Sequence, residues 1–190
     1  MKTQLAMLTL AVSCAFAGNA MALTKEEYKT QKDRVEADYK ASKEKCATLS
    51  ANAKDICQAE AKGAEKVAKA ELEAQYKPSP RNDKQVRDAK ADAAYDLAKE
   101  KCDDLAGNAK DVCMKEAKAA RTSAKADAKV SKAGAEANKD KADNVAEARK
   151  EANSDKNEAM YKAAKERCDT MSGAAKDGCQ NDAKVKFGMK

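Results

Sequence analysis

A 24-residue segment occurs three times in this chain, and this repeat constrains the fold more than any other feature. The copies cover residues 39–62, 95–118 and 161–184, and each places a tyrosine, two cysteines and a Lys-Asp pair at the same positions. Self-similarity of this kind is the signature of proteins that stack one supersecondary unit several times. We therefore expect three copies of one structural unit along the chain.

The first half of each copy has the spacing of a helix that packs on one side. In the second copy, Ala91, Tyr95, Ala98, Cys102 and Leu105 follow one another at intervals of four, three, four and three residues. This spacing keeps the side chains on one face of a helix, against a partner helix. The predicted seam residues of the three copies are Tyr39, Leu49, Tyr95, Leu105, Tyr161 and Met171.

The residues that follow predict a turn and a second helix. Gly107 suits the left-handed conformation that ends a helix, and Asn108 followed by Asp111 is typical of a cap at the start of the next helix. Each copy is thus predicted to be a helical hairpin with a turn of two or three residues. Ala174 replaces the capping asparagine in the third copy, so we expect that hairpin to be the weakest. The predicted seam of the second arm comprises Ala109, Cys113, Ala117, Ala120 and Ala124.

Each repeat contains two cysteines with ten residues between them, and we predict that they pair within their own repeat. Six cysteines allow 15 pairings in principle. A unit duplicated as a whole has to satisfy its own pair, however, and a hairpin brings both members to the same level on facing arms. The predicted disulfides are Cys46–Cys57, Cys102–Cys113 and Cys168–Cys179.

Other interpretations of these cysteines and tyrosines stay open at this point. The absence of histidine and the ten-residue spacing both disfavour a metal site. Thiol exchange usually relies on a Cys-x-x-Cys motif, and only the basic neighbours Lys45, Lys101 and Arg167 favour it here. A ligand-binding role for the three tyrosines is the alternative to their place in the seam.

The composition favours an elongated helical protein over a globular one. Beyond residue 22 the chain has 168 residues, of which only 14 are Leu, Ile, Val or Phe and 37 are Ala. So few large apolar residues do not build an ordinary core, whereas alanine is the best helix former. We predict an all-α fold: an elongated array of three disulfide-stapled antiparallel hairpins, joined by Ala/Lys-rich helical linkers. No catalytic motif is present, and we expect neither an enzyme nor a cofactor.

The first 22 residues have the pattern of a cleaved secretory signal. Lys2 precedes an apolar run over residues 5–17, and Ala20 and Ala22 form a small-x-small cleavage site. Lipid anchoring at Cys14 is the alternative, because residues 10–14 loosely resemble a lipobox. Export predicts an oxidising compartment in which disulfides persist.

The chain divides into a signal peptide and four further segments. The two prolines at positions 78 and 80 break the helical pattern between the first and second hairpins. The predicted segments are the signal peptide (1–22), hairpin repeat 1 (23–77), hairpin repeat 2 (78–132), an Ala/Lys-rich helical linker (133–156) and hairpin repeat 3 (157–190).

The formal net charge of +6 is small for a chain in which 37% of the residues are charged. Nucleic-acid-binding proteins concentrate basic residues on one face, and here the only small basic cluster is Lys184, Lys186 and Lys190. We therefore expect no nucleic-acid partner. Lysine-lined helices leave binding of anionic envelope components open.

The repeat K-E-K-C-D-D-L-A-G-N-A-K-D-V-C-x-x-E-A-K over residues 99–118 resembles a group of proteobacterial periplasmic proteins, some of them labelled TolA-like cell-envelope proteins. The resemblance covers the signal, the three hairpins and the central Ala/Lys stretch. It implies a periplasmic location and a helical architecture. The likeness to TolA itself is one of composition, Ala/Lys/Glu-rich helix.

The sequence therefore favours a non-enzymatic, exported periplasmic protein with a structural, scaffolding or envelope-stress role. One alternative is a binding module for anionic envelope components, and another is a thiol-based redox or holdase protein. Envelope proteins are possible partners, and self-association through an Ala/Tyr seam is also open.

Overall fold

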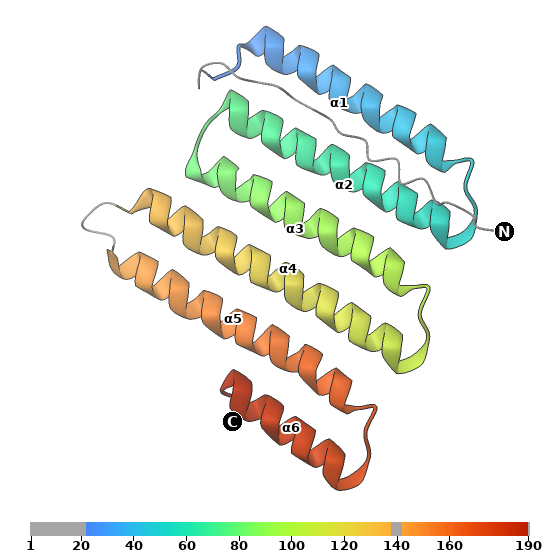
Figure 1. Cartoon of the computed structure of the whole chain (residues 1–190). Coiled ribbons are helices and arrows are strands. Elements are labelled where there is room, and N and C mark those ends of the chain that lie inside the picture. The colour runs from blue at the N-terminus through green and yellow to red at the C-terminus, as the bar shows by residue number, and fades with distance from the viewer. Residues whose placement is uncertain (1–21, 138–141, 190) are drawn as a thin grey trace, which may run out of the picture.

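The computed structural model of the chain describes residues 22–137 and 142–189, and this part is entirely helical apart from turns and ends (Figure 1). Residues 1–21 of the predicted signal peptide, including Cys14 and Ala20, lie outside the described residues, and Ala22 is the first described residue. The helices are α1 (Lys25–Cys46), α2 (Ala51–Tyr76), α3 (Pro80–Cys102), α4 (Gly107–Glu136), α5 (Ala142–Cys168) and α6 (Gly173–Phe187).

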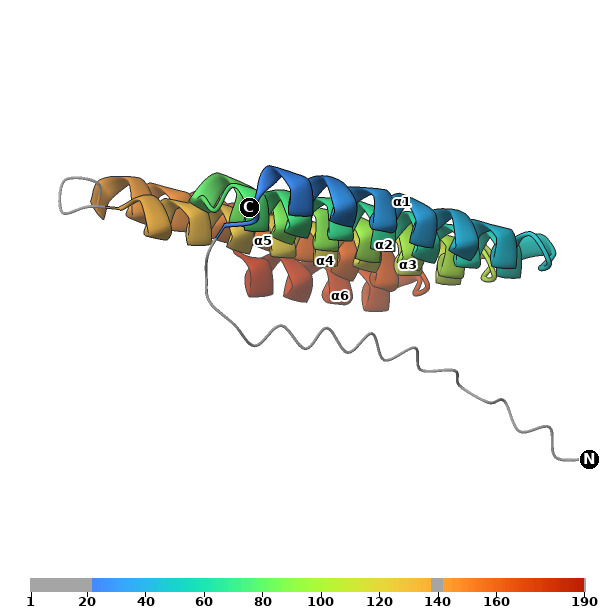
Figure 2. The same cartoon turned by 90° about the horizontal axis from the view of Figure 1, so that it is seen from above.

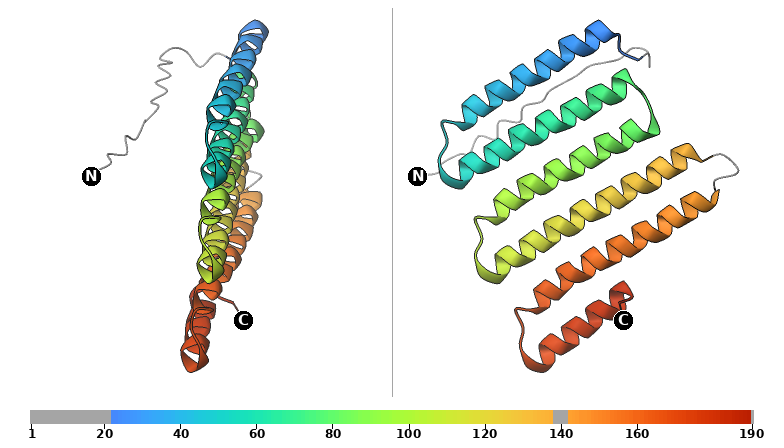
Figure 3. Two further views of the ribbon diagram at one scale, coloured as in Figure 1. Left: turned by 90° about the vertical axis from the view of Figure 1, so that its right-hand side faces the viewer. Right: turned by 180° about the vertical axis from the view of Figure 1, so that it is seen from behind.

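The helices run antiparallel and form a single layer. Each helix packs extensively only on the helices before and after it in the chain, and the edge-on view in Figure 3 shows one thin sheet of helices. Figure 2 shows the layer from above, and successive helices lie behind one another in that view. The predicted all-α array of three stapled hairpins is confirmed, and its hairpins lie side by side in contact.

The turns within hairpins and the connections between hairpins lie at opposite edges of the layer (Figure 1). The turn within each hairpin has four residues, over 47–50, 103–106 and 169–172. The predicted length of two or three residues was therefore wrong, because the first helix stops at the cysteine. As a result, all three disulfides and turns line the same edge.

The connection between the first two hairpins follows the predicted break. Helix α2 ends at Tyr76, and α3 begins at Pro80. Proline fits the first position of a helix because the amide hydrogen it lacks would have no partner there. The side chain of Ser79 accepts a hydrogen bond from the backbone amide of Asn82 at 3.1 Å and caps α3.

The inner helices bury two opposite faces, which the sequence analysis did not anticipate. In α4, Ala117 and Ala128 are buried on one side, and Ala119 and Ala126 on the other. Ala128 lies beside residues of α3, and Ala119 beside residues of α5. The predicted second-arm seam was thus wrong at three positions, because it assumed one neighbour where α4 has two. The exposed residues are Ala109, Ala120 and Ala124.

Residues 133–156, expected to be a helical linker, belong to the array itself. Their described part forms the end of α4 and the first half of α5, and these halves pack on each other. Ala148 and Ala152 are buried in α5. Alanine lets the two backbones approach closely, so this segment is part of the most extensive helix–helix interface.

Ion pairs join neighbouring helices along the faces of the layer. Between α2 and α3, Lys66 pairs with Asp96 at 3.1 Å and Lys90 with Glu71 at 2.7 Å. Other pairs link α4 to α5, among them Lys129 with Glu151. Many basic side chains therefore meet a carboxylate of the adjacent helix, and the charge of the surface is largely compensated locally.

Candidate functional site

The three predicted disulfides are all present. The Cα atoms are 5.5 Å apart in Cys46–Cys57 and 5.7 Å apart in each of the other two pairs. The first cysteine of each pair ends a helix and is almost fully buried, with exposed fractions of 1%, 0% and 1%. A buried sulfur is poorly accessible to another thiol, so this geometry favours structural bonds.

The predicted seam tyrosines occupy equivalent positions in their helices and are similarly buried. Tyr39, Tyr95 and Tyr161 are half-buried and lie two helical turns before the buried cysteine that ends their helix. The guanidinium of Arg121 in α4 stands over the ring of Tyr95 in α3, 5.0 Å from the ring centre. The three tyrosines lie in three different hairpins, each at the same position of its own hairpin.

The other predicted seam residues lie outside the helices. Leu49, Leu105 and Met171 occupy the turns and are 43%, 43% and 47% exposed. Their assignment to the helix seam was wrong, because the first helix of each hairpin ends three residues earlier, at the cysteine. They form a series of exposed apolar side chains along the disulfide edge, one in each hairpin.

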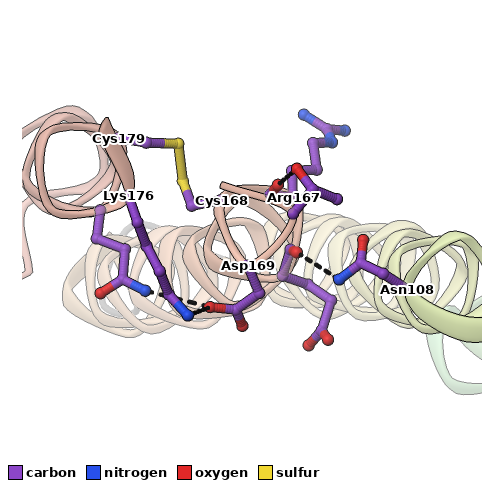
Figure 4. The surroundings of a disulfide bond; sticks show 9 residues. Asn108, Arg167, Cys168, Asp169, Lys176 and Cys179 are labelled. Atoms are coloured by element: carbon purple, nitrogen blue, oxygen red, sulfur yellow. Dashed lines mark hydrogen bonds and ion pairs between the residues drawn. A yellow bond between two sulfur atoms is a disulfide. The ribbon is translucent and has the colours of Figure 1, made fainter. Parts of the chain in front are cut away.

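The asparagine that the first two repeats share joins one hairpin to the next. The side-chain amide of Asn52 donates to the carbonyl oxygen of Glu100 at 2.8 Å, and that of Asn108 donates to the carbonyl oxygen of Glu166 at 3.2 Å (Figure 4). The predicted role of Asn108 as a cap of its own helix was wrong. It satisfies a carbonyl in the last turn of the next hairpin's first helix. Ala174 stands at the corresponding position of the third repeat.

Charged pairs also close the second and third turns. Lys110 contacts Asp103 at 2.8 Å, and Lys176 contacts Asp169 at 2.9 Å (Figure 4). The hydrogen bond from each lysine holds the pKa of its aspartate below the usual range. Ala47 replaces the aspartate in the first turn, so this closure is specific to the second and third hairpins.

A groove of about 810 Å³ lies across α4, α5 and α6. Met160 of α5 and Phe187 of α6 are among its apolar lining residues. Met160 is 40% exposed. The small lining residues of α4 and α5 are Ala119, Ala120, Ser123, Ala124, Ala163 and Ala164. Volumes of this size are typical of small-molecule sites.

Charged residues at the groove divide into paired and unpaired ones. Arg167 is held by Glu116, with Nε 2.7 Å from the carboxylate, and Asp127 pairs with Lys156. Lys186 stands over the ring of Phe187, 5.5 Å from its centre. Among the described residues, no ion-pair partner lies within 4.0 Å of Lys186 or Asp182.

The groove was not predicted from the sequence, although the repeats differ at four of the positions that line it. Ser123 and Ala163 occupy the positions that Val67 and Leu97 hold in the preceding repeat. The side chains at these two lining positions are therefore smaller than their counterparts. At two other lining positions they are larger or more apolar, because Met160 corresponds to Ala94 and Phe187 to Arg121.

Three disulfides are typical of proteins in an oxidising, extracytoplasmic compartment. Within residues 22–137 and 142–189, none of the helices combines the length and apolar character that crossing a membrane requires. Comparison of the chain with protein-family models, with curated proteins and with solved structures finds no significant match.

Proposed function

We propose that this chain is a non-enzymatic, exported scaffold of the periplasm with a structural or envelope-stress role. The observation that carries the proposal is the single-layer array closed by a disulfide in each hairpin. A layer of this kind offers a large surface relative to its buried interior. Covalent bonds compensate for the small core, and each of them holds the two helices of one hairpin together beside the turn.

The surface charge supports a scaffold over a dedicated binder of anionic envelope components. Lys66, Lys90 and Arg167 each pair with a carboxylate of a neighbouring helix. Exposed pairs of this kind contribute little energy individually, but they leave no concentrated basic face among the described helices that would attract a polyanion.

The first test is to recover the chain from the periplasmic fraction of its native host and measure its intact mass without reduction. The proposal expects a chain that begins at Leu23 and contains three disulfides. A chain retained in the cytoplasm, or one with free thiols, would contradict it.

The role itself is tested by deleting the gene and challenging the cells with detergent and osmotic shock. We expect weakened envelope integrity that the wild-type chain restores. A matched variant with Cys102 and Cys113 both changed to Ser, expressed at equal level, should restore it less well. Normal integrity in the deletion strain would overturn the proposed role.

A further inference from the structure

We propose that the outer face of α1 is a docking surface for the second arm of a hairpin, and that three residues of α6 keep a second copy of the chain from docking there. These residues are Ala174, Gly178 and Val185. The inference goes beyond the scaffold role and does not depend on it. It rests on the two interfaces between successive hairpins, whose receiving residues recur in α1 and whose docking residues are replaced in α6.

The interface between successive hairpins occurs twice, as α2 on α3 and as α4 on α5. Small residues meet across both of them. Ala93 of α3 lies against Gly63 of α2, and Ala159 of α5 lines a small hollow together with Ala119 of α4. Each interface therefore joins the second arm of one hairpin to an alanine on the first arm of the next.

Helix α1 has the receiving residues of this interface on its outer face. Ala37 stands at the position of Ala93. Glu44 stands at the position of Glu100, whose carbonyl oxygen accepts a hydrogen bond from Asn52. Both residues of α1 are exposed, whereas their counterparts in α3 are half-buried beside α2. The outer face of α1 therefore presents a small contact residue and a carbonyl group where α3 and α5 receive a hairpin.

Helix α6 differs from α2 and α4 at three positions of the face that docks. In the first two repeats the residues at these positions are buried or half-buried, and in α6 they are exposed, with Val185 at 83%. From the first to the third repeat, the residues are Asn52, Asn108 and Ala174 at one position, Ile56, Val112 and Gly178 at the next, and Gly63, Ala119 and Val185 at the last.

Each exchange weakens docking on α1 for its own physical reason. Ala174 has no amide to donate to a carbonyl oxygen, and Gly178 has no apolar side chain to bury. Val185 adds bulk where the helices come closest, since a Cβ atom at position 63 would already lie 2.9 Å from that of Ala93. The interface of α4 and α5 accommodates alanine at this position, but valine adds two further methyl groups.

Charge does not account for the block, because one ion pair of the interface has its counterpart on the two outer faces. Arg167 of α5 donates a hydrogen bond to Glu116 of α4 at 2.7 Å. Lys45 of α1 and Asp182 of α6 occupy the equivalent positions. The two outer faces are therefore complementary in charge at this point, and restoring the three exchanged residues should be enough for docking.

A contact between α6 of one copy and α1 of the next joins two unlike faces. Such an interface extends from copy to copy unless its rotation closes a ring. A second arm that fitted α1 would therefore lengthen the layer chain by chain, and the three residues of α6 keep the protein in single units.

The test compares the full oxidised chain with the variant Ala174→Asn, Gly178→Val and Val185→Ala, which carries the docking residues of α4. Association is followed by sedimentation and by NMR chemical shifts up to millimolar concentration, because α6 has only 15 residues against 30 in α4. We expect the wild type to stay monomeric. The variant should associate at least about ten-fold more tightly, since one hydrogen bond and one buried valine each contribute about five-fold.

Three further variants locate the contact. Adding Ala37→Arg to the triple variant should abolish association, because a long charged side chain then occupies the contact point on α1. Adding Ala120→Arg, at an exposed position of α4, is the matched control and should leave association unchanged. The variant with Ala174→Asn and Val185→Ala alone keeps Gly178 and should associate with intermediate strength. Circular dichroism checks that every variant is helical.

Three results would each overturn the inference. The first is association of the wild type as tight as that of the triple variant, since α6 would then be no obstacle. The second is a folded triple variant that stays monomeric at millimolar concentration, since α1 would then be no docking surface. The third is association that Ala37→Arg leaves unchanged, since the contact would then lie elsewhere.

Discussion

Gly63 of α2 lies so close to Ala93 of α3 that a Cβ atom at position 63 would be 2.9 Å from the Cβ atom of Ala93. Carbon atoms do not approach to this distance without a shift of one of them. The two backbones of neighbouring hairpins therefore meet at a point where only glycine fits. Small residues set the spacing between the hairpins, and the array is sensitive to a single methyl group there.

We expect Gly63→Ala to lower the free energy of unfolding by about 1–3 kcal/mol, the usual cost of overpacking. Urea unfolding of the oxidised chain measures it. Gly178→Ala in α6 is the control, because its Cβ would meet no atom within 4 Å, and it should stabilise by up to about 1 kcal/mol through helix propensity. The second change Ala93→Gly should recover part of the loss. If Gly63→Ala raised the free energy of unfolding as much as Gly178→Ala does, the close contact between Gly63 and Ala93 would be contradicted.

Ala51 adopts a left-handed conformation, with φ of 49°, at the position where the later repeats have Gly107 and Gly173. A residue with a side chain pays about 1–2 kcal/mol in this region relative to glycine. We therefore expect Ala51→Gly to raise the free energy of unfolding by about 1 kcal/mol, and Gly107→Ala to lower it by a similar amount. Thermal unfolding of both variants measures the two effects.

The control for this pair is Ala53→Gly, two residues further into α2, where the position is exposed and helical. There glycine should destabilise by up to about 1 kcal/mol. The strain at position 51 would be disproved if glycine destabilised at both positions.

Asn108→Ala removes the amide that joins the second hairpin to the carbonyl of Glu166. We expect a loss of about 1 kcal/mol, the typical net contribution of one hydrogen bond. Asn181→Ala, at an exposed helical position of α6, measures the gain in helix propensity from the same substitution. The difference between the free energies of unfolding of the two variants, measured with urea, gives the contribution of the hydrogen bond. Identical effects of the two substitutions would rule out a stabilising contact across the hairpins.

Replacing both cysteines of one hairpin by serine should destabilise the chain by about 3 kcal/mol, because each disulfide closes a short loop in the unfolded state. The pair Cys102–Cys113 lies in the middle hairpin and Cys168–Cys179 in the last one. Hydrogen exchange should show increased opening in both cases, centred on the hairpin that lacks the bond. Unchanged exchange throughout would mean that the helices hold the hairpins together without the staples.

The carboxylate of Asp92 links α3 to α4 through Lys125, at 2.8 Å, and Arg121. Burial alone would raise the pKa of Asp92, but hydrogen bonds and charge from the two cations outweigh burial and lower the pKa. The pKa is lower in the folded than in the unfolded chain. The resulting stability is therefore complete above the unfolded-state pKa and is lost as the pH falls through the folded-state pKa.

Titration of Asp92 by carboxyl NMR should give a midpoint below that of an exposed aspartate, and Lys125→Gln should raise it. The stability difference between wild type and Asp92→Asn should be full at pH 7 and should shrink in strong acid. An unshifted midpoint would show that neither cation engages this carboxylate in solution.

The repeat alone was enough to predict the hairpins and their disulfides. Identical spacing of Cys102 and Cys113 in a duplicated unit fixes which sulfurs meet, since each unit has to fold by its own contacts. The layer was not predicted, because a single seam gives each helix one partner, whereas Ala117 and Ala119 are buried on opposite faces of α4. The prediction that Leu49 and Leu105 lie in the helix seam was wrong for a local reason, because the first helix of each hairpin ends at the cysteine.

The groove and the asparagine contacts escaped prediction because they involve residues of different hairpins. Asn108 has the sequence context of a helix cap, and only the position of α5 beside it makes Glu166 the nearer acceptor. Likewise, Ser123 and Ala163 are ordinary residues of an Ala-rich helix. Their significance appears when they are set against Val67 and Leu97 at the same positions of the preceding repeat.

Because each helix contacts mainly its predecessor and its successor, the number of hairpins is not fixed by a common core. A gene duplication that inserted another hairpin between Lys77 and Pro78 would replace the interface of α2 and α3 by two interfaces between successive hairpins and leave the contacts within each existing hairpin intact. Loss of a hairpin would be tolerated in the same way. The width of the layer is thus an evolutionary variable, open to change by whole repeats, while the chain's two edge helices stay the same.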